Sequence, residues 1–233
     1  MTDSPSKDIS RMDLGEGSEG VWAITPHGEF LGKTLAEFNL VEGAAVLELG
    51  AGMANHTILL ARQRAASIVA TEIHEDYLAT AEANFERNCP DYSPIQFVVA
   101  DWLSVEGSYD VIVTNPPFAK SGKQNRRYYI DSLILDGHKR LKLGGRLVFV
   151  HSSMADLGET KQRLQRNGYD LEIVASTQNP FRDYYFEDQT FMDDIQAVPN
   201  GFEVRDGTHF ETLYVIHAKL RSWSPPEGAH LAP

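Results

Sequence analysis

The sequence predicts an α/β protein built on one doubly wound, mostly parallel sheet. Short runs rich in β-branched residues recur between residues 45 and 218, and stretches with a helical spacing of apolar residues separate several of them. A glycine-containing turn follows the first run. Strands that alternate with helices favour parallel βαβ units. Because ligands bind at the carboxyl ends of the strands in such sheets, the residues that follow each strand are the candidates for chemistry.

Seven strands and several helices are predicted from the periodicity of apolar residues. The strands cover residues 45–49, 67–73, 95–100, 109–115, 146–152, 169–175 and 212–218. The helices cover residues 74–88, 126–142 and 156–167, and residues 22–31 lead into an earlier helix that reaches Phe38.

The size and composition of the chain suit one globular domain. The chain has 233 residues, of which 42% are hydrophobic and 23% charged. We expect a single domain over 21–223, flanked by flexible segments at 1–20 and 224–233. Apolar runs fall short of the ~18 residues of a membrane span, the first residues lack a signal-peptide pattern, and the single cysteine suits a reducing compartment. These features predict a cytoplasmic protein without a membrane partner.

The net charge of −12 disfavours a nucleic-acid partner, because phosphate backbones require basic surfaces. The charge is uneven along the chain. Residues 119–146 carry eight basic and two acidic side chains, whereas residues 183–211 carry eight acidic side chains and one basic. We interpret both stretches mainly as solvated faces of opposite sign. The basic stretch keeps an anionic substrate or a structured RNA open as alternatives.

A glycine turn follows the first predicted strand. Glu48 and Leu49 end that strand, and Gly50 and Gly52 follow in the turn. Glycines let the backbone turn sharply and approach a ligand closely, and the next helix presents its amino end to the same place. A tight turn without a ligand gives the same pattern, and the position of this one as the first βα turn favours a nucleotide-type loop.

Acidic residues follow the next two strands. Glu72 comes 20 residues after Gly52, where an acid accepts hydrogen bonds from both hydroxyls of a ribose. Asp101 follows the third strand and is placed to accept from the exocyclic amine of an adenine. Ile73 and Trp102 are candidates for the apolar surface beside the base. Each acid alone is more often a cap or loop residue, but three successive strand ends together predict a nucleoside site.

The fourth strand runs into Asn115-Pro116-Pro117-Phe118. Consecutive prolines fix φ and remove two amide donors at the end of a strand. They would hold the Asn115 side-chain amide and the Pro116 carbonyl as paired acceptors, with Phe118 as an apolar face for a planar group. This arrangement suits an amine or amide nitrogen. A stiff loop with Phe118 in the core is the alternative.

Taken together, these motifs resemble the class I S-adenosylmethionine-dependent methyltransferases, in the amino-methyltransferase branch with an (N/D)PP(F/Y) motif. The resemblance implies a Rossmann-like sheet of seven strands with the last one antiparallel, and S-adenosylmethionine as cofactor. Ala54 departs from the pattern, because a third glycine is common there. The residues that carry the resemblance are Glu48, Gly50, Gly52, Glu72, Asp101, and Asn115 to Phe118.

The resemblance also implies a reaction. The sulfonium methyl is electrophilic, so the enzyme mainly has to align a nitrogen lone pair with the carbon–sulfur bond. Asn115 and the Pro116 carbonyl would accept the two N–H hydrogens, and Phe118 would stack on the substrate. This chemistry needs no metal, and the histidines lack metal-ligand spacing. His27 is a candidate for contact with the cofactor carboxylate or the substrate, although such a residue is more often part of a helix start.

A long segment separates the last two predicted strands. Five aromatic residues, Tyr184 and Tyr185 among them, lie within eleven positions of it. We expect residues 179–210 to be an insertion that forms either a lid over the site or a small satellite core. As a lid, it would place both tyrosines in the catalytic pocket, together with Asn115, Pro116 and Phe118.

The predicted function is N-methylation of a planar amine or amide nitrogen in a small molecule or a protein side chain. One alternative is intramolecular ring closure of the cofactor with release of methylthioadenosine, as in azetidine-carboxylate synthases. Methylation of adenine or guanine in nucleic acid is another, and a binding module without chemistry is disfavoured by the Asn115 motif. The identity of the substrate and the oligomeric state are left open.

Overall fold

The computed structural model of the protein describes residues 12–14, 24–118 and 126–222. Within these residues the strands are β1 (Ala45–Leu49), β2 (Ser67–Glu72), β3 (Ile95–Val99), β4 (Tyr109–Thr114), β5 (Leu141–Ser152), β6 (Tyr169–Pro180), β7 (Glu203–Arg205) and β8 (Thr208–Leu220). The α-helices are α1 (Pro26–Phe38), α2 (Asn55–Arg62), α3 (Glu75–Asn88), α4 (Tyr128–Asp136), α5 (Leu157–Arg166) and α6 (Gln189–Gln196).

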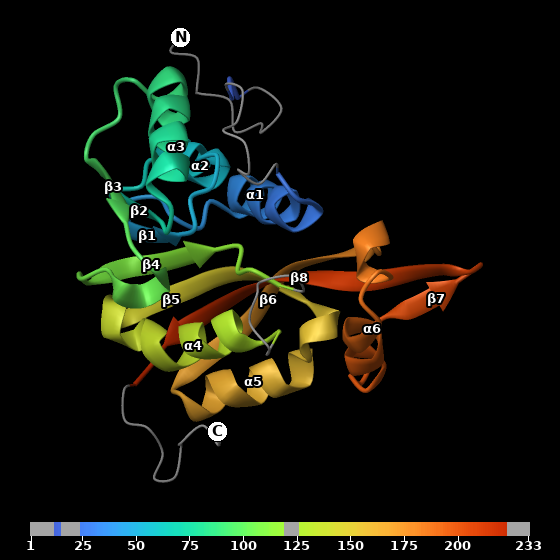
Figure 1. Ribbon diagram of the computed structural model, residues 1–233. Helices are drawn as coiled ribbons and strands as arrows, with labels where there is room; N and C mark the ends of the chain where they lie inside the picture. The colour runs from blue at the N-terminus through green and yellow to red at the C-terminus, as the bar shows by residue number, and fades with distance from the viewer. Residues whose placement is uncertain (1–11, 15–23, 119–125, 223–233) are drawn as a thin grey trace.

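The strands form one sheet in the order β3-β2-β1-β4-β5-β8-β6, with β7 paired to β8 outside this path. Strands β1 to β5 pair in parallel, and β8 runs antiparallel to β5, β6 and β7. Helices α1, α2 and α3 lie on one side of the sheet and α4 and α5 on the other (Figure 1). The predicted Rossmann-like α/β fold with an antiparallel last strand is therefore confirmed.

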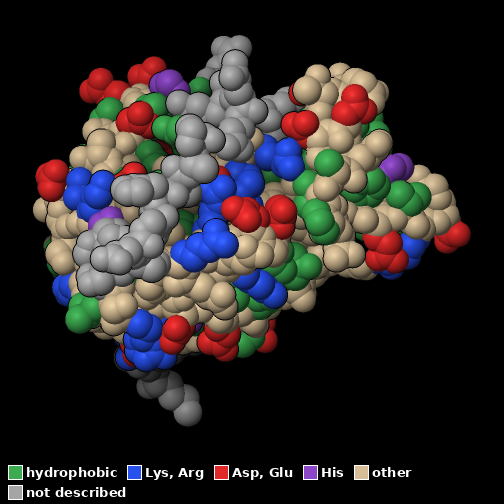
Figure 2. Space-filling model, turned by 90° about the horizontal axis from the view of Figure 1, so that it is seen from below, with side chains coloured by type: hydrophobic (Ala, Val, Ile, Leu, Met, Phe, Trp, Pro, Cys, Tyr) green, Lys and Arg blue, Asp and Glu red, His purple; other side chains and the backbone are tan. Residues whose placement is uncertain are grey.

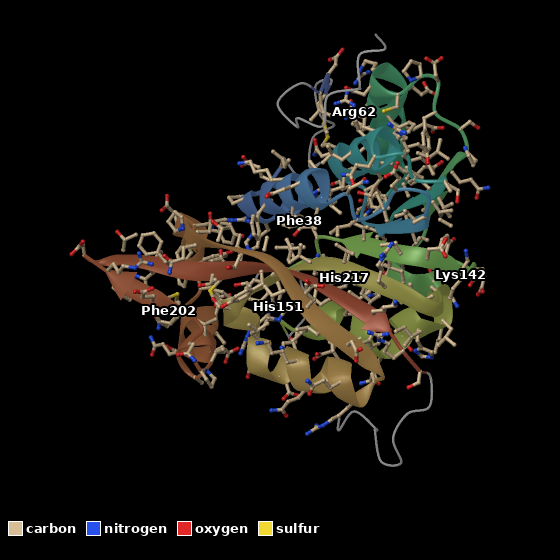
Figure 3. The ribbon with its side chains drawn as sticks, turned by 180° about the vertical axis from the view of Figure 1, so that it is seen from behind. Phe38, Arg62, Lys142, His151, Phe202 and His217 are labelled. Atoms are coloured by element: carbon tan, nitrogen blue, oxygen red, sulfur yellow. The ribbon has the colours of Figure 1, made fainter. Side chains whose placement is uncertain are left out.

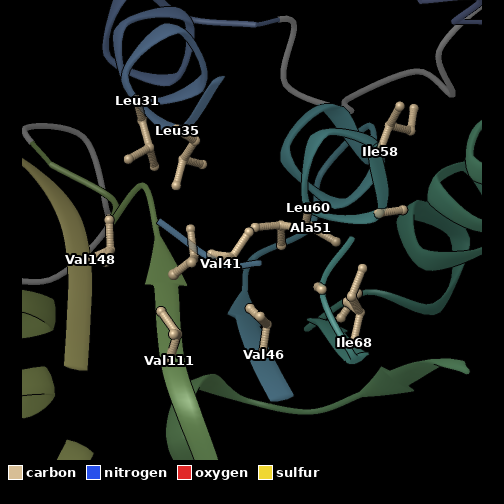
Figure 4. Close-up of a cluster of buried hydrophobic side chains, with 14 of the residues drawn as sticks. Leu31, Leu35, Val41, Val46, Ala51, Ile58, Leu60, Ile68, Val111 and Val148 are labelled. Atoms are coloured by element: carbon tan, nitrogen blue, oxygen red, sulfur yellow. The ribbon is translucent and has the colours of Figure 1, made fainter. Parts of the chain in front are cut away.

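The two faces of the sheet are covered by separate apolar clusters. On the first face, Leu31 and Leu35 of α1 are fully buried and point toward the sheet, with Val41 in the same cluster (Figure 4). On the second face, Leu133 of α4 and Leu164 of α5 are fully buried among the side chains of the other cluster. Burial of both faces explains why the central strands read as nearly continuous apolar runs.

The helix predicted over residues 126–142 is wrong in its extent. Helix α4 ends at Asp136, a 3-10 turn follows over Gly137–Arg140, and β5 begins at Leu141. Leu141 pairs with Tyr109 of β4 and is buried as a strand residue, although its spacing also fits a helical face. The register shifts after this pair, close to Gly144, whose φ of +82° favours glycine.

The last strands are longer than predicted, and they build an extension of the sheet. Strand β6 continues to Pro180 and β8 begins at Thr208, and β7 pairs with this outer part of β8. We call residues 176–210 the extension; α6 and β7 lie in it (Figure 1). Phe202 marks the extension at one end of the molecule, and Lys142 at the start of β5 lies near the other end (Figure 3).

A satellite apolar cluster holds the extension together. It contains Ile195 of α6, which is fully buried, and Tyr185, which is 1% exposed. Phe118, from the loop after β4, packs against this cluster and meets Phe191 edge-on with ring centroids 6.1 Å apart. The expected alternatives of a lid and a satellite core therefore do not exclude each other, because the cluster reaches the residues after β4.

Most of the described basic residues between 126 and 146 are paired with acids. Arg127 is buried and lies 2.9 Å from Asp131, and Lys142 lies 2.9 Å from Asp110. Lysine, arginine and acidic side chains alternate over one face of the molecule (Figure 2). Further pairs join Arg126 to Asp194, Lys139 to Asp136, and Arg140 to Glu106. Lys120 and Lys123 lie outside the described residues.

The predicted flexible ends fall mainly outside the part of the chain that the structure describes. Of residues 1–20, only 12–14 are described, and Met12 and Leu14 pack against the first apolar cluster. Residues 224–233 lie outside the described part. Within it, the helices are all too short or too polar to cross a bilayer.

Replacement of Ile195 by alanine tests how far the extension depends on its own core. Because Ile195 is 0% exposed, we expect Ile195→Ala to lower the free energy of unfolding by about 2–5 kcal/mol. Denaturant unfolding followed by fluorescence measures this loss. Gln196→Ala, at the exposed end of the same helix, is the control, and equal stability of the two variants would contradict the packing of α6.

Candidate functional site

A pocket of about 410 Å³ opens at the carboxyl ends of the parallel strands. It lies where the strand order reverses between β1 and β4, which is the usual ligand position in such sheets. The pocket brings together nearly all the residues that we predicted for the site. Its lining includes Gly50, Gly52, Glu72, Ile73, Asp101, Trp102, Asn115, Pro116, Phe118, Tyr184 and Tyr185.

The glycine loop forms one wall of the pocket. Gly50 and Gly52 have φ values of +78° and +54°, and a Cβ on either would meet no atom within 4 Å among the described residues. The loop therefore leaves open space beside its backbone. The Gly50 and Ala51 amides donate to the Thr71 carbonyl of β2, which fixes the turn. Ala54 has a φ of +67°, so the third position also favours glycine, and alanine there tolerates some strain.

Glu48 lies beneath this loop, outside the pocket lining. Its side chain is 1% exposed and accepts a hydrogen bond of 2.5 Å from the Thr57 hydroxyl of α2. Burial raises the pKa of the Glu48 carboxyl to about 8, so the group is mostly neutral at pH 7. Direct contact of Glu48 with a cofactor stays a prediction, and its observed contact fixes α2 against β1.

Glu72 stands at the mouth of the pocket, at the end of β2. Its two carboxylate oxygens accept from the Gly52 amide at 3.1 Å and from the Ile73 amide at 2.8 Å. The carboxylate is thus held beside the glycine loop, and it is half-buried. Lone pairs remain on both oxygens, because each accepts a single hydrogen bond here. Ile73 is 51% exposed and lies next to it on the lining.

Asp101 and Trp102 follow β3 on the same side. Asp101 is exposed, and Trp102 adopts a φ of +45°, which is unfavourable for a residue with a large side chain. The Trp102 ring packs edge-on against Tyr129 of α4, with centroids 4.8 Å apart. Its indole Nε1 is buried without a partner among the described residues. Such strain and an unpaired donor are typical of a binding site.

The loop after β4 places Asn115, Pro116 and Phe118 on the pocket lining, and Pro116 is largely buried there. The first turn of α1 packs over Asn115, because a Cβ on Gly28 would lie 3.4 Å from the Asn115 Nδ2 atom. His56 of α2 holds that turn through a contact of 2.8 Å between its Nε2 and the Gly28 carbonyl. Burial lowers the pKa of His56, so the ring is neutral and donates this bond.

The extension supplies another part of the pocket lining. Tyr184 and Tyr185 line the pocket with ring centroids 4.8 Å apart, and burial raises the pKa of Tyr185 well above its usual range. Arg182 lines the same wall. His27, from the first turn of α1, is buried and joins this group through contacts to Arg182 and to Glu211 of β8.

Our sequence reasoning missed Arg182 and Glu211. Arg182 stands within the aromatic run of the extension, where its charge is no signal of a pocket. Glu211 directly precedes the predicted strand 212–218, and the structure places it inside β8, fully buried. An acid between Phe210 and that apolar strand is the one sequence signal that pointed to it. Among the described residues, no group of three or more His, Cys, Asp or Glu side chains is arranged to hold a metal.

Comparisons with known proteins agree with this geometry. The sequence profile of the methyltransferase small domain matches residues 27–180, which is more than half of the chain. A candidate protein N5-glutamine methyltransferase of Methanocaldococcus jannaschii is 30% identical over 159 residues, which cover 61% of this chain and 79% of that protein. The release factor glutamine methyltransferase of Shewanella oneidensis is 30% identical over 153 residues, which cover 63% of this chain and 50% of that protein.

Solved structures show the same fold. A candidate methyltransferase of Bacillus halodurans superposes with a TM-score of 0.58 at 17% sequence identity, covering 82% of this chain and 99% of that chain. At this identity the likeness concerns the fold alone. The family match rests on the sequence comparisons, and residues 27–180 of the profile match include the glycine loop, Glu72, Asp101 and Asn115. This chain belongs to the methyltransferase small domain family and is a class I S-adenosylmethionine-dependent methyltransferase of the amino-methyltransferase branch.

Proposed function

We propose that this chain methylates a planar amine or amide nitrogen of a small molecule or a protein side chain. The observation that carries the proposal is the position of Asn115 to Phe118. This motif follows β4, directly beside β1 and its glycine loop, and both line one pocket. A nitrogen held by Asn115 would therefore lie next to a cofactor held by the loop.

The residues present fit S-adenosylmethionine. The open backbone at Gly50 and Gly52, the free lone pairs of Glu72 and the exposed Asp101 suit a nucleoside with two ribose hydroxyls and an exocyclic amine. The buried Asn55 Oδ1 atom also lines the pocket without a partner among the described residues, so it can accept a ligand hydrogen. We infer that these groups hold the nucleoside and its amino-acid chain.

When bound, the cofactor supplies an electrophilic methyl group on a sulfonium. Asn115 Oδ1 and the Pro116 carbonyl then have to accept the two N–H hydrogens of the substrate, which orients the nitrogen lone pair toward that methyl. Phe118 stacks on the planar group and limits its rotation. This chain therefore acts mainly by alignment. Methyl transfer then takes place between two groups bound in one complex and no longer depends on a bimolecular encounter.

Two features favour a side-chain or small-molecule amide as the acceptor. The relatives from Methanocaldococcus jannaschii and Shewanella oneidensis are named as glutamine methyltransferases, so an amide nitrogen fits the shared motif. The described basic residues between 126 and 146 are largely neutralised by acids, so they offer little free charge to a phosphate backbone.

We further propose that the extension acts as a lid. Arg182, Tyr184 and Tyr185 reach the pocket from it, and Phe118 ties the motif loop to its satellite cluster. An aromatic wall excludes water and attracts a sulfonium by cation–π interaction.

A product assay tests the reaction itself. We expect adenosylhomocysteine when S-adenosylmethionine is incubated with glutamine peptides or small primary amides. Release of methylthioadenosine without adenosylhomocysteine would instead indicate ring closure of the cofactor and would overturn the proposal.

Glu72→Ala is expected to weaken adenosylhomocysteine binding by roughly ten- to a hundredfold, the range for a lost hydrogen bond to a charged group. Isothermal calorimetry measures the change. Glu75→Ala, at the exposed start of α3, removes the same charge outside the pocket lining and should bind as the wild type does. Equal affinity of the two variants would contradict a role of Glu72 in the nucleoside site.

Asn115→Ala is expected to abolish turnover while adenosylhomocysteine affinity stays within a few-fold, because Asn115 is assigned to the reacting nitrogen. Adenosylhomocysteine release and calorimetry measure the two quantities. Asn115→Asp keeps a side-chain acceptor at the same position and should retain part of the activity. If Asn115→Ala loses binding and turnover in the same proportion, the residue belongs to the cofactor site instead.

Tyr184→Ala and Tyr185→Ala are expected to differ. Tyr185 is 1% exposed within the satellite cluster, so its loss should lower the melting temperature, with a cost of about 3–5 kcal/mol for a buried aromatic. Tyr184 is half-buried on the pocket wall, so its loss should change activity or product more than stability. Thermal melting and the product assay separate the effects. Full specific activity of both variants in the folded fraction would exclude the lid.

A further inference from the structure

A chain of polar contacts crosses from the core to the pocket wall. Glu211 of β8 is fully buried, and its Oε2 atom lies 3.2 Å from His27 Nε2 of α1. His27 Nδ1 lies 2.6 Å from an Arg182 terminal nitrogen, and the other terminal nitrogen of Arg182 donates to the Tyr184 hydroxyl at 3.1 Å. Residues far apart in the sequence thus meet at one wall.

The direction of each hydrogen bond follows from chemistry. A guanidinium has donors and no acceptor, so Arg182 donates and His27 Nδ1 accepts. The proton of the imidazole is then on Nε2, which donates to Glu211. Ser152 also donates to Glu211 Oε2, at 2.5 Å. The imidazole therefore holds the guanidinium in a fixed orientation relative to a buried acid.

Arg182 keeps unused donors in this arrangement. A guanidinium offers five N–H groups, and the contacts above engage two of them. Its Nε is buried without a partner among the described residues. Because Arg182 lines the pocket, its remaining donors are available to a ligand.

We propose that Arg182 binds a carboxylate of the ligand, and that His27 and Glu211 are positioning residues for it. Planar guanidinium donors match a carboxylate in a bidentate contact. This inference rests on the proposed function and specifies a group that Arg182 recognises, the carboxylate of an amino-acid moiety. The carboxylate belongs either to the methionyl part of the cofactor or to the methyl acceptor, and both place the same chemistry beside Arg182.

The first experiment compares two nucleosides by calorimetry. Adenosylhomocysteine carries the amino-acid carboxylate, and 5′-methylthioadenosine has no amino-acid group. If Arg182 binds the cofactor carboxylate, Arg182→Gln should weaken adenosylhomocysteine at least tenfold and leave methylthioadenosine unchanged. Arg205→Gln removes an exposed cation of the same extension outside the pocket lining and is the matched control.

The second experiment tests the acceptor as the source. Protein saturated with adenosylhomocysteine is titrated with amino acids and with the matching decarboxylated amines, and binding is followed by thermal shift. If the acceptor carries the carboxylate, amino acids should stabilise the wild type, amines should not, and Arg182→Gln should lose the difference while its adenosylhomocysteine affinity is unchanged.

The positioning role has its own variants. Glu211→Gln keeps an acceptor for His27 but removes the charge. His27→Gln interrupts the chain of polar contacts between Glu211 and Arg182. Both variants should lose part of the preference that Arg182→Gln loses, either for adenosylhomocysteine over methylthioadenosine or for amino acids over amines. Both should still bind methylthioadenosine, which shows that the fold is intact.

The outcomes separate the two proposals. If neither nucleoside binds the wild type, the proposed function fails. If nucleosides bind but Arg182→Gln changes neither the preference for adenosylhomocysteine nor the response to amino acids, the carboxylate site is overturned while the nucleoside site stands.

Discussion

The structure depends on one topological constraint, the reversal of strand order between β1 and β4. Because these neighbours leave the sheet toward helices on opposite faces, the loops that follow them separate and leave a space between them. The glycine loop and the Asn115 loop form the two sides of that space. β2 and β3 then place Glu72 and Asp101 along one edge of it, in the order of the strands. Each residue of the site occupies its position because its strand ends there.

Two buried acids illustrate how the surroundings decide the role of a carboxyl group. Glu48 has a hydroxyl partner from Thr57, and burial raises its pKa to about 8. It serves the packing of α2 against β1 as a mostly neutral group. Glu211 receives donors from Ser152, Asn179 and His27, and through His27 it meets a guanidinium. The first acid therefore packs beneath the glycine loop, and the second connects through His27 to Arg182 on the pocket lining.

The sequence was sufficient to predict the fold and the four strand ends, because both follow from local patterns. Gly50, Glu72, Asp101 and Asn115 each follow an apolar run, and the parallel sheet brings such positions together. The chain of polar contacts from Glu211 through His27 to Arg182 could not be predicted, because His27 is 184 residues from Glu211 and 155 from Arg182 in the sequence. Leu141 shows the converse limit: its spacing fits a helix, but pairing with Tyr109 makes it a strand residue. The periodicity of apolar residues within one segment carries no information about pairing with a distant strand.

Strands β6 and β8 run without interruption from the sheet into the extension, and this continuity limits how the enzyme can diversify. A natural boundary for exchanging the extension lies near Pro180 and Thr208, where paired strands leave the body of the sheet. Glu211 falls on the retained side of that boundary and Arg182 on the exchanged side. A transplanted extension without an arginine would leave a buried acid and its histidine without their cation. Exchange of the extension therefore requires matched changes at His27 or Glu211, which lie outside it.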